Sequence, residues 1–315
     1  MTESKTQPIY EIAINARISW QAHSLSNAGS DGSNRIFPRR QLLADGLSTD
    51  ACSGAIAKHY HAAILAEYMD NAGIKLCAPC AEGDNRRAGA LAGVKGYENL
   101  TIDDILATCG LCDVHGFLVT GKKGKRDGAT ETRQRLAKHS LIDFSFALAL
   151  PDHHAESVQL RTRSGTPDGE GQMLIKNSVR SGDYAFCVRY KSAGVGMDTN
   201  TRRLVVDNEE ERRRRHCATL AALRDQIVSP SGAMTATLLP HLTGMMGAIV
   251  VRTSAGRAPL YSPLTNGFID QLMTLADRDC HVYPFGDITS FHRSMRRLID
   301  TSMPAGPVVQ TAISK

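Results

Sequence analysis

Two CxxC pairs are the feature of this sequence whose spacing most directly indicates chemistry. Cys77 and Cys80 form the first pair, Cys109 and Cys112 form the second, and 28 residues separate the pairs. Two intervening residues allow both thiolates of a pair to bind one tetrahedral zinc ion, and two pairs supply all four ligands. A closed four-sulfur site leaves no position for a substrate, so the sequence predicts a structural zinc ion rather than a catalytic one.

Two alternatives compete with this zinc interpretation. In the first, His115, which lies close to Cys112, replaces one cysteine as a ligand. In the second, the four thiols share their spacing by coincidence. A redox role is disfavoured, because it would need a CxxC at the start of a helix in a thioredoxin-like βαβ unit, and that setting is missing.

The sequence offers little support for catalysis. It has no Walker loop, GxGxxG motif or HExxH motif, and no nucleophile motif surrounds its paired histidines. Asp31, within a Ser-Asp-Gly-Ser segment, is typical of a turn in one interpretation and of a metal-binding ribonuclease carboxylate in another. Because a single carboxylate is weak support for metal chemistry, we predict that the chain is not an enzyme.

The composition is that of a globular protein with a small basic excess. Of the 315 residues, 42% are hydrophobic and 22% are charged, and the net charge is +5. No run of about eighteen apolar residues occurs, so the sequence predicts no transmembrane helix. Segment 1–8 lacks the apolar core of a signal peptide, and we therefore expect a cytoplasmic protein whose eight cysteines are thiols or metal ligands.

Basic residues gather in segments that contain glycine and serine. They include Arg35, Arg39, Arg40, Lys122, Lys123, Lys125, Arg126, Lys176 and Arg180. Loop cations beside glycines can approach phosphates closely, although a solvated surface explains most basic clusters. Segment 151–181 also holds Met173 and Ile175 beside Lys176, an arrangement that suits either wedging between bases or packing on the domain. The Arg212–Arg215 run follows three glutamates at i, i+4 spacing, which favours a solvated helix face over RNA contact.

Periodicity predicts strands and helices interrupted by two long excursions. Strands are expected at 9–20, 114–120, 142–150, 184–190 and 247–252, and helices at 51–71, 102–108 and 209–228. Segments 21–50 and 151–181 are polar and rich in glycine, and are expected to be long loops. Beyond residue 263, two helices should flank a short apolar segment at 282–285. The order strand, helix, strand, strand, helix, strand is that of a ferredoxin-like or RRM-like α+β domain.

Several segments, taken in order, resemble one protein family. They are Ala16–Asn27 (ARISWQAHSLSN), Ser53–His61 (SGAIAKHYH), Asp113–Leu118 (DVHGFL), the Gln172–Ser181 loop that leads into Tyr184–Tyr190, and the Asp207–Leu223 helix. The chain thereby resembles the DevR-type backbone subunits of type I CRISPR Cascade complexes, which belong to the RAMP superfamily, and is most similar to the I-A and I-B subtypes. The resemblance runs in order over most of the chain, from Ile9 to Arg252.

The resemblance implies a hand-shaped α+β protein. An RRM-like, ferredoxin-like βαββαβ palm would comprise residues 1–71, 113–150 and 183–252. A helical finger insertion would occupy 72–112 and hold the predicted zinc ion, and a protruding thumb loop would occupy 151–182. The remainder, 253–315, would be a C-terminal helical part packed on the palm.

The resemblance also implies a function in guide (CRISPR) RNA binding without chemistry. Copies of the chain would polymerise helically along the guide and support its pairing with a target DNA strand. The implied partners are the guide RNA, the target strand, other copies of the chain, and the cap, large and small Cascade subunits, with no membrane. Related type III subunits cut target RNA with a loop aspartate; Asp31 lies in the corresponding loop, but type I members do not cleave.

The resemblance and the loop cations together give a set of expected RNA-binding residues. They are His23, Ser24, Asn27, Arg35, Arg39, Arg40, Ser53, Gly54, Lys58, His61, Lys122, Lys123, Met173, Ile175, Lys176 and Arg180. Two other functions stay open. One is a metal-dependent RAMP ribonuclease with Asp31 as its carboxylate, and the other is a zinc-dependent DNA-binding regulator, although a recognition-helix pattern is missing.

Overall fold

The computed structural model describes residues 6–31, 35–38, 40–44, 46–97, 99–120, 124–126, 129–131, 135–163 and 173–306. At positions 30–31, 35–38, 124–126, 129–131, 161–163 and 173–175, which lie in strands, the backbone alone is described. Of the predicted RNA-binding residues, Arg39, Lys122 and Lys123 lie outside the described residues.

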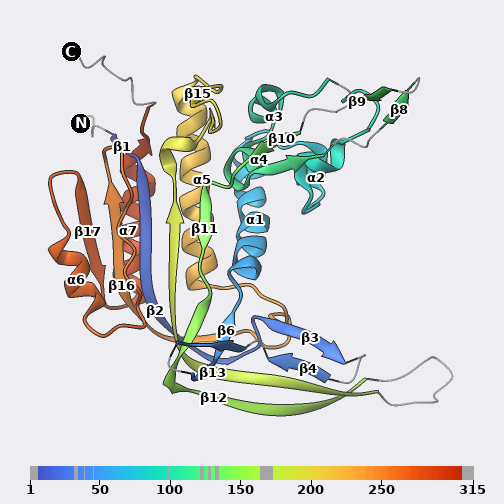
Figure 1. The fold of residues 1–315 in the computed structure, drawn as a ribbon. Helices are drawn as coiled ribbons and strands as arrows, with labels where there is room; N and C mark the ends of the chain where they lie inside the picture. Colours follow the sequence, from blue (N-terminus) through green and yellow to red (C-terminus); the bar gives the residue numbers. More distant parts are fainter. Residues whose placement is uncertain are drawn as a thin grey trace.

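The described chain is a mixed α and β fold, which confirms the predicted α+β class (Figure 1). Its helices are α1 (Gly54–Asn71), α2 (Ala78–Ala81), α3 (Ile102–Thr108), α4 (Gly110–His115), α5 (Glu209–Val228), α6 (Phe268–Thr274) and α7 (Ile288–Thr301), with short 3-10 helices η1 (Arg87–Leu91) and η2 (Ser192–Gly194). The strands up to the insertion are β1 (Gln7–Ile9), β2 (Glu11–His23), β3 (Asn27–Asp31), β4 (Arg35–Pro38), β5 (Arg40–Leu42) and β6 (Ser48–Cys52). The later strands are β7 (Phe117–Val119), β8 (Gly124–Arg126), β9 (Ala129–Glu131), β10 (Leu136–Lys138), β11 (Ile142–Phe144), β12 (Ala147–Arg163), β13 (Met173–Tyr190), β14 (Met197–Asp198), β15 (Arg203–Leu204), β16 (His241–Arg252), β17 (Cys280–Phe285) and β18 (Ser302–Pro304).

The central sheet is built around β2, which lies between β13 and β16. The strand order is β17-β16-β2-β13-β12-β6-β5, and each neighbouring pair is antiparallel. Ile12, Ile14 and Ile18 of β2 belong to the larger core on one face, whereas Ala13 belongs to a smaller core on the other. Because side chains alternate between the two faces of a strand, this pattern shows that β2 is covered on both sides.

Helices α1, α5 and α7 supply the larger core. Leu65 of α1, Leu220 of α5 and Phe291 of α7 are fully buried in it. Capping residues determine where these helices begin: Asn208 accepts a hydrogen bond from Glu211 N at 3.0 Å at the start of α5. The predicted spans 102–108 and 209–228 are confirmed as α3 and α5. None of the described helices is long and apolar enough to cross a membrane.

Hydrogen bonds from β2 hold a covering segment over the second face of the sheet. Ala258 N donates to Glu11 Oε1 at 2.9 Å, and Tyr261 N donates to Asn15 Oδ1 at 3.1 Å. Arg17 Nε donates to the carbonyl of Pro263 at 2.5 Å. These polar β2 residues alternate with the core isoleucines, so the covering segment explains why both faces of the first half of the strand are buried.

Between α1 and β11 the chain forms an insertion of short helices and strands. Its helices lie together at the upper right of Figure 1, and β7 pairs with β10. Gly116 has φ of 73°, and a Cβ here would lie 2.4 Å from the carbonyl oxygen of Lys138, so glycine is required where α4 meets β7. The strand predicted at 114–120 is shorter than expected, because Gly110–His115 completes a helical turn first.

A buried carboxylate joins this insertion to helix α5. Asp113 of α4 pairs with Lys138, and Arg215 Nη1 lies 3.1 Å from Asp113 Oδ2. The same oxygen accepts a hydrogen bond from Gly196 N at 2.8 Å, and Arg215 also donates to the carbonyl of Leu106 at 2.9 Å. All three charged side chains are buried, and such a network stabilises only when it is complete.

The Arg212–Arg215 run is therefore not the solvated face that its spacing predicts. Arg212 and Arg215 are buried, and Arg212 donates to the carbonyls of Val195 and Ala305, each at 2.8 Å. The expected i, i+4 pair does form once, since Arg215 Nε lies 2.9 Å from Glu211 Oε1. The solvated-face prediction was wrong for two of the four arginines because α5 packs against both the sheet and the insertion.

The two polar excursions contain strands where loops were expected. β12 and β13 pair continuously from Ala155–Ser181 to Arg163–Met173, so the expected thumb loop is a long hairpin that projects at the lower right of Figure 1. Segment 21–50 holds β3, β4, β5 and part of β6. The loop prediction was wrong because cross-strand pairing satisfies backbone N–H and C=O groups even where few side chains are apolar.

The C-terminal region is not purely helical. The two expected helices are α6 and α7, and the apolar segment 282–285 lies in β17, which joins the main sheet beside β16. β18 pairs in parallel with β1, which brings the two ends of the described chain together. The domain boundaries expected from the sequence stay predictions.

The buried network around Asp113 gives a testable expectation. Replacing Asp113 by Ala should lower the free energy of unfolding by about 3–5 kcal/mol, because two buried cations would lose their counter-charge. Asp103→Ala is the matched control: Asp103 pairs with Arg203 at the surface, where such a pair contributes about 0–1 kcal/mol. Urea unfolding of both variants measures the difference, and equal losses would contradict this role of Asp113.

Candidate functional site

Several predicted RNA-binding residues meet where the hairpin leaves the sheet. Arg180 of β13 is buried, and its Nη1 lies 3.3 Å from Asp50 Oδ1. Its Nη2 donates to the carbonyl of Ser26 at 2.8 Å and to Ser24 Oγ at 3.3 Å. Tyr184 donates to Asp50 Oδ2 at 2.6 Å. The guanidinium thus contacts groups of the protein itself, and it holds the loop after β2 against β13.

His23, at the end of β2, belongs to the same cluster. It is fully buried, with its ring centroid 5.7 Å from that of Trp20 and 5.0 Å from that of Tyr184. Burial, assisted by the positive charge of Arg180, lowers the pKa of His23 to about 3. The imidazole is therefore neutral at physiological pH. Asn27, the remaining predicted residue of this loop, is half-buried.

The start of α1 packs against the same loop. Ser53 caps the helix by accepting a hydrogen bond from Ala55 N at 3.2 Å, and its own N–H donates to Ser26 Oγ at 3.2 Å. A Cβ on Gly54 would lie 2.4 Å from the carbonyl oxygen of Phe144, so only glycine allows this approach. The loop, β11 and the helix start form one packed unit.

Two predicted residues lie further along α1. Lys58 is half-buried, and burial, followed by the charge of Arg87, lowers its pKa. His61 is fully buried, with Nδ1 2.8 Å from His115 Nε2. In this arrangement His61 cannot contact a phosphate, whereas the ammonium of Lys58 lies at a cavity described below.

The exposed cations lie on the hairpin side. Lys176 of β13 is exposed, and Arg40 of β5 is exposed and pairs with Glu156 of β12. For Arg35, Met173 and Ile175 the structure describes only the backbone. Surface-available charge near the hairpin thus comes, among side chains that the structure describes, from Lys176 and Arg40.

Sequence reasoning missed two exposed apolar residues on the hairpin. Val158 and Leu160 of β12 are 63% and 61% exposed, and they lie opposite Ser178 and Lys176 of β13. Being two positions apart, they share a face of the strand. The signal was available as the alternation of Val158 and Leu160 with polar neighbours, but it was hidden by the expectation of a loop.

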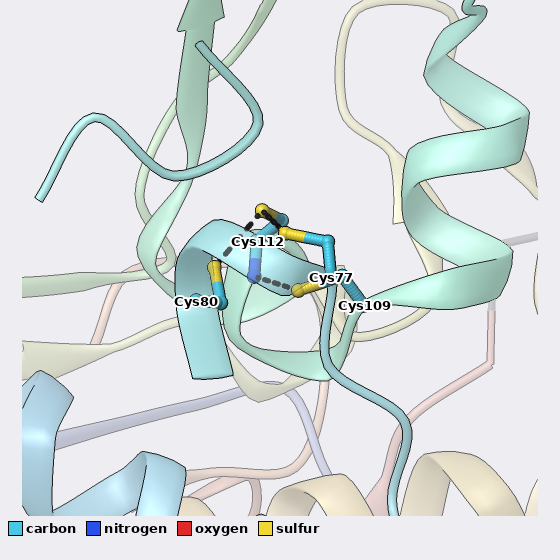
Figure 2. Close-up of side chains that lie close together, drawn as sticks. All are labelled: Cys77, Cys80, Cys109 and Cys112. Carbon is cyan, nitrogen blue, oxygen red and sulfur yellow. Dashed lines mark hydrogen bonds between the residues drawn. The ribbon is translucent and has the colours of Figure 1, made fainter. Parts of the chain in front are cut away.

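The four cysteines of the CxxC pairs come together in the insertion (Figure 2). Their sulfurs all lie within 4.8 Å of one another, with Cys112 Sγ 3.5 Å from Cys80 Sγ and 3.8 Å from Cys77 Sγ. Four sulfurs bound tetrahedrally at about 2.3 Å from one ion would be about 3.8 Å apart. The cluster therefore fits a single tetrahedral metal ion, and His115, which bonds His61, is not part of it.

The protonation of these thiols also fits a metal ion. Hydrogen bonding from Cys112 lowers the pKa of Cys109, whereas hydrogen bonding to Cys109 raises the pKa of Cys80 and of Cys112. The four thiols therefore do not deprotonate together unless a cation joins them. Cys112 N donates to Cys109 Sγ at 3.3 Å, the kind of backbone contact that orients a thiolate ligand.

A second cluster of metal ligands is absent from the side chains that the structure describes, since the cysteines form the only group of three or more such residues found there. The backbone of Asp31 ends β3, and its side chain lies outside that description. Among the side chains that the structure describes, no carboxylate cluster supports the ribonuclease alternative, which stays a prediction.

The family of this chain is shown by a comparison with family models. The sequence model of a family described as "CRISPR-associated negative auto-regulator DevR/Csa2" matches residues 14–272. No curated protein matches the chain. Among solved structures, a chain of a "CRISPR RNA-guided surveillance complex" has 11% identity and TM-score 0.48, covering 92% of this chain and 98% of its own. A chain of a "CRISPR RNA-guided surveillance complex, pre-nicking" has 13% identity and TM-score 0.47, covering 86% and 90%. Csc2 of Thermofilum pendens has 12% identity and TM-score 0.35, covering 93% and 77%.

Buried histidines predict acid sensitivity, and the expected slope is worked out for three of them. Burial lowers the pKa of His23 and of His216 to about 3 and that of His61 to about 4, and it also lowers the pKa of His115 well below its ordinary value. Unfolded histidine titrates near 6.5, so the unfolded chain binds more protons below that pH, and stability should be complete above about 6.5 and fall towards pH 4.

Each of these histidines should contribute a slope of about 1.4 kcal/mol per pH unit in that window. Urea unfolding between pH 7 and pH 4.5 measures this slope, and His216→Gln should reduce it by one histidine's share. The control, His292→Gln, replaces an exposed histidine and should leave the slope unchanged. A pH-independent unfolding free energy would show that the three histidines are not neutral and buried.

Proposed function

Because this chain belongs to the DevR/Csa2 family of CRISPR-associated proteins, we propose that it is a guide-RNA-binding backbone subunit of a type I Cascade complex. The observation that carries the proposal is the family match over residues 14–272. In the proposed role, copies of the chain assemble helically along the guide RNA, and the assembly supports pairing with a target DNA strand. The cap, large and small subunits are its further partners, and the complex acts in the cytoplasm.

The strand order supports an RRM-like palm. β2, α1, β12, β13, α5 and β16 follow one another in the chain in the order βαββαβ, and their strands lie in the sheet as β16-β2-β13-β12. This is the arrangement of a ferredoxin-like domain. The hairpin of β12 and β13 then corresponds to the thumb, and the cysteine-bearing insertion to the fingers.

Burial divides the predicted RNA-binding residues by role. Arg180, His23 and Ser24 are buried, and in the proposal they shape the loop that follows β2. Lys176 is exposed and can reach phosphates, whereas the exposed Arg40 is paired with Glu156. Val158 and Leu160, exposed beside Lys176, offer an apolar surface for bases or for a neighbouring copy.

The proposed role is binding without catalysis. The ribonuclease alternative would require Asp31 to cut target RNA with a metal ion, and the proposal assigns no reaction to it. The family description favours a second candidate, a zinc-dependent DNA-binding regulator, because it contains the words negative auto-regulator. A regulator would bind duplex DNA in the absence of guide RNA, whereas the proposed subunit would not.

The metal ion at the four cysteines is proposed to be zinc. Four thiolates in a closed tetrahedral arrangement are typical of structural zinc sites. Cys77 precedes α2 and Cys80 lies within it, while Cys109 precedes α4 and Cys112 lies in its first turn, so the ion would tie α2 to α4. It would hold the fold of the insertion and take no part in a reaction.

Co-expression with the neighbouring genes and a repeat array tests the proposed function. We expect several copies of the chain to retain a discrete RNA of repeat-plus-spacer type. Lys176→Ala and Lys58→Ala should each weaken RNA binding roughly fivefold, and equally for unrelated guides, because phosphate contacts carry no sequence information. Lys191→Ala, beyond the far end of β13, is the matched control and should have little effect.

Three outcomes would contradict the proposal. Retention of duplex DNA instead of RNA would favour the regulator. Regularly spaced cuts in complementary RNA with magnesium, lost in Asp31→Ala, would favour the ribonuclease. A strong dependence of affinity on guide sequence would show that bases rather than phosphates dominate recognition.

Metal analysis tests the zinc proposal separately. The purified chain should contain about one zinc ion, and Cys112→Ser should lose it and expose residues 72–112 to proteolysis. Cys217→Ser is the control, because Cys217 is half-buried, lies outside the cluster and donates to the carbonyl of Ile299, a bond that serine can keep. A stably folded wild-type chain without metal would refute the zinc site.

A further inference from the structure

A basic cavity lies where the insertion meets helix α1. It has a volume of about 460 Å³, and its walls come from α1, η1, the end of α4, β7 and the segment around β10. Its cationic side chains are Lys58, Arg86, Arg87 and Lys138, of which Lys138 is paired with Asp113, and the imidazoles of His115 and His139 also line it. Of the described residues that line it, none is acidic.

Two of its cations have no salt bridge among the described residues. Arg86 binds Asp84 through two guanidinium nitrogens, but Lys58 and Arg87 form no ion pair there. Burial and then the charge of Arg87 lower the pKa of Lys58, whereas the smaller effect of the Asp143 carboxylate, which pairs with Arg189, raises it. Lys58 and Arg87 therefore repel each other, and Asp143 offsets only part of that repulsion. An anion placed between them would remove that repulsion.

A buried imidazole adds an unsatisfied polar atom. His115 is 2% exposed, its Nε2 lies 2.8 Å from His61 Nδ1, and its Nδ1 has no hydrogen-bond partner. His61 Nε2 lies 3.4 Å from the carbonyl oxygen of Thr219, which can only accept, so the neutral His61 donates there. Its Nδ1 therefore accepts from His115 Nε2, and His115 Nδ1 is an acceptor. Buried polar atoms are almost always paired in native proteins, so this atom indicates a missing donor such as a water molecule at the cavity.

The backbone at the cavity is held in an unusual conformation. Arg87 has φ of 52°, in the left-handed region that residues other than glycine rarely adopt, and strain of this kind clusters at binding sites. On the neighbouring turn, a Cβ on Gly89 would lie 2.5 Å from the carbonyl oxygen of Leu118. Close packing of η1 on β7 therefore fixes the direction from which Arg87 enters the cavity.

We propose that this cavity binds one phosphate group, with Arg87 and Lys58 as its cations. Guanidinium and ammonium groups that form no salt bridge of their own are the groups that recognise phosphate oxygens. Lys58 lies just over one turn beyond Ser53 on α1, so a nucleic acid at the start of this helix could extend a phosphate into the cavity. The inference rests on the proposed guide-RNA function and adds one defined contact to it.

The proposed zinc ion would help to hold the walls of this cavity in place. The chain leaves Cys80 in α2 and reaches Arg87 at η1, while Cys112 and His115 both belong to α4. An ion shared by the two CxxC pairs holds these two walls of the cavity in register. The site is therefore tested on the full chain with its metal retained.

Inorganic phosphate is the first probe, added to the purified chain against sodium chloride of equal ionic strength. Near saturation, phosphate should raise the melting temperature by about 2 °C or more. Arg87→Ala should weaken phosphate binding about tenfold. Arg296→Ala, which removes an exposed arginine of α7 that pairs with Asp300 and does not line the cavity, should change it less than twofold. No shift in the wild type, or equal shifts in both variants, would overturn the site.

Guide RNA is the second probe and identifies the source of the phosphate. Arg87→Ala should reduce the slope of log affinity against log salt by about 0.7, as expected for one lost phosphate of a single strand, while Arg296→Ala keeps the wild-type slope. A loss seen only when the target strand is added would assign the phosphate to that strand. If the wild type retains no RNA, the proposed function is contradicted, and the phosphate titration still decides whether the cavity binds phosphate. If RNA binds and Arg87→Ala keeps the wild-type slope, the cavity does not contact the RNA, and only that part of the inference is contradicted.

Discussion

The buried carboxylate of Asp113 is the constraint on which the arrangement of insertion and sheet depends. It comes from α4 and neutralises Lys138 after β7 and Arg215 on α5, so three segments distant in sequence meet at one charge. The carboxylate oxygen that contacts Arg215 also accepts a hydrogen bond from Gly196 N, which adds the segment that follows β13. Because an unpaired charge is costly in a protein interior, these elements hold one another in a single arrangement.

That arrangement places two projections on the same side of the sheet in Figure 1: the cysteine-bearing insertion and the hairpin of β12 and β13. Helix α1 begins beside the base of the hairpin and runs to the insertion. The Arg180–Asp50 pair orders one end of this path, and the pair of His61 with His115 orders the other. The helix that begins beside the hairpin thus reaches the basic cavity with Lys58, within its second turn.

Burial changes the role that a basic or polar residue can have in such a site. Arg180, Arg212 and Arg215 bind protein carbonyls or carboxylates, so they add shape to the site and stability to the fold. Lys58 and Arg87 are also partly enclosed, but they have no ion pair among the described residues. The difference between a structural and a ligand-seeking cation is therefore decided by whether a counter-charge is already present.

The sequence by itself determined the features that depend on local spacing. The CxxC pairs, the spans of α3 and α5, and the order of strands and helices follow from short-range periodicity and capping, which act within a few residues. Only the tertiary structure decided that the polar excursions form strands, that His61 and Arg180 are buried, and that Lys58 meets Arg87 and His115. Strand pairing and burial depend on partners far away in the chain, and one sequence read locally carries no signal for which partners those are.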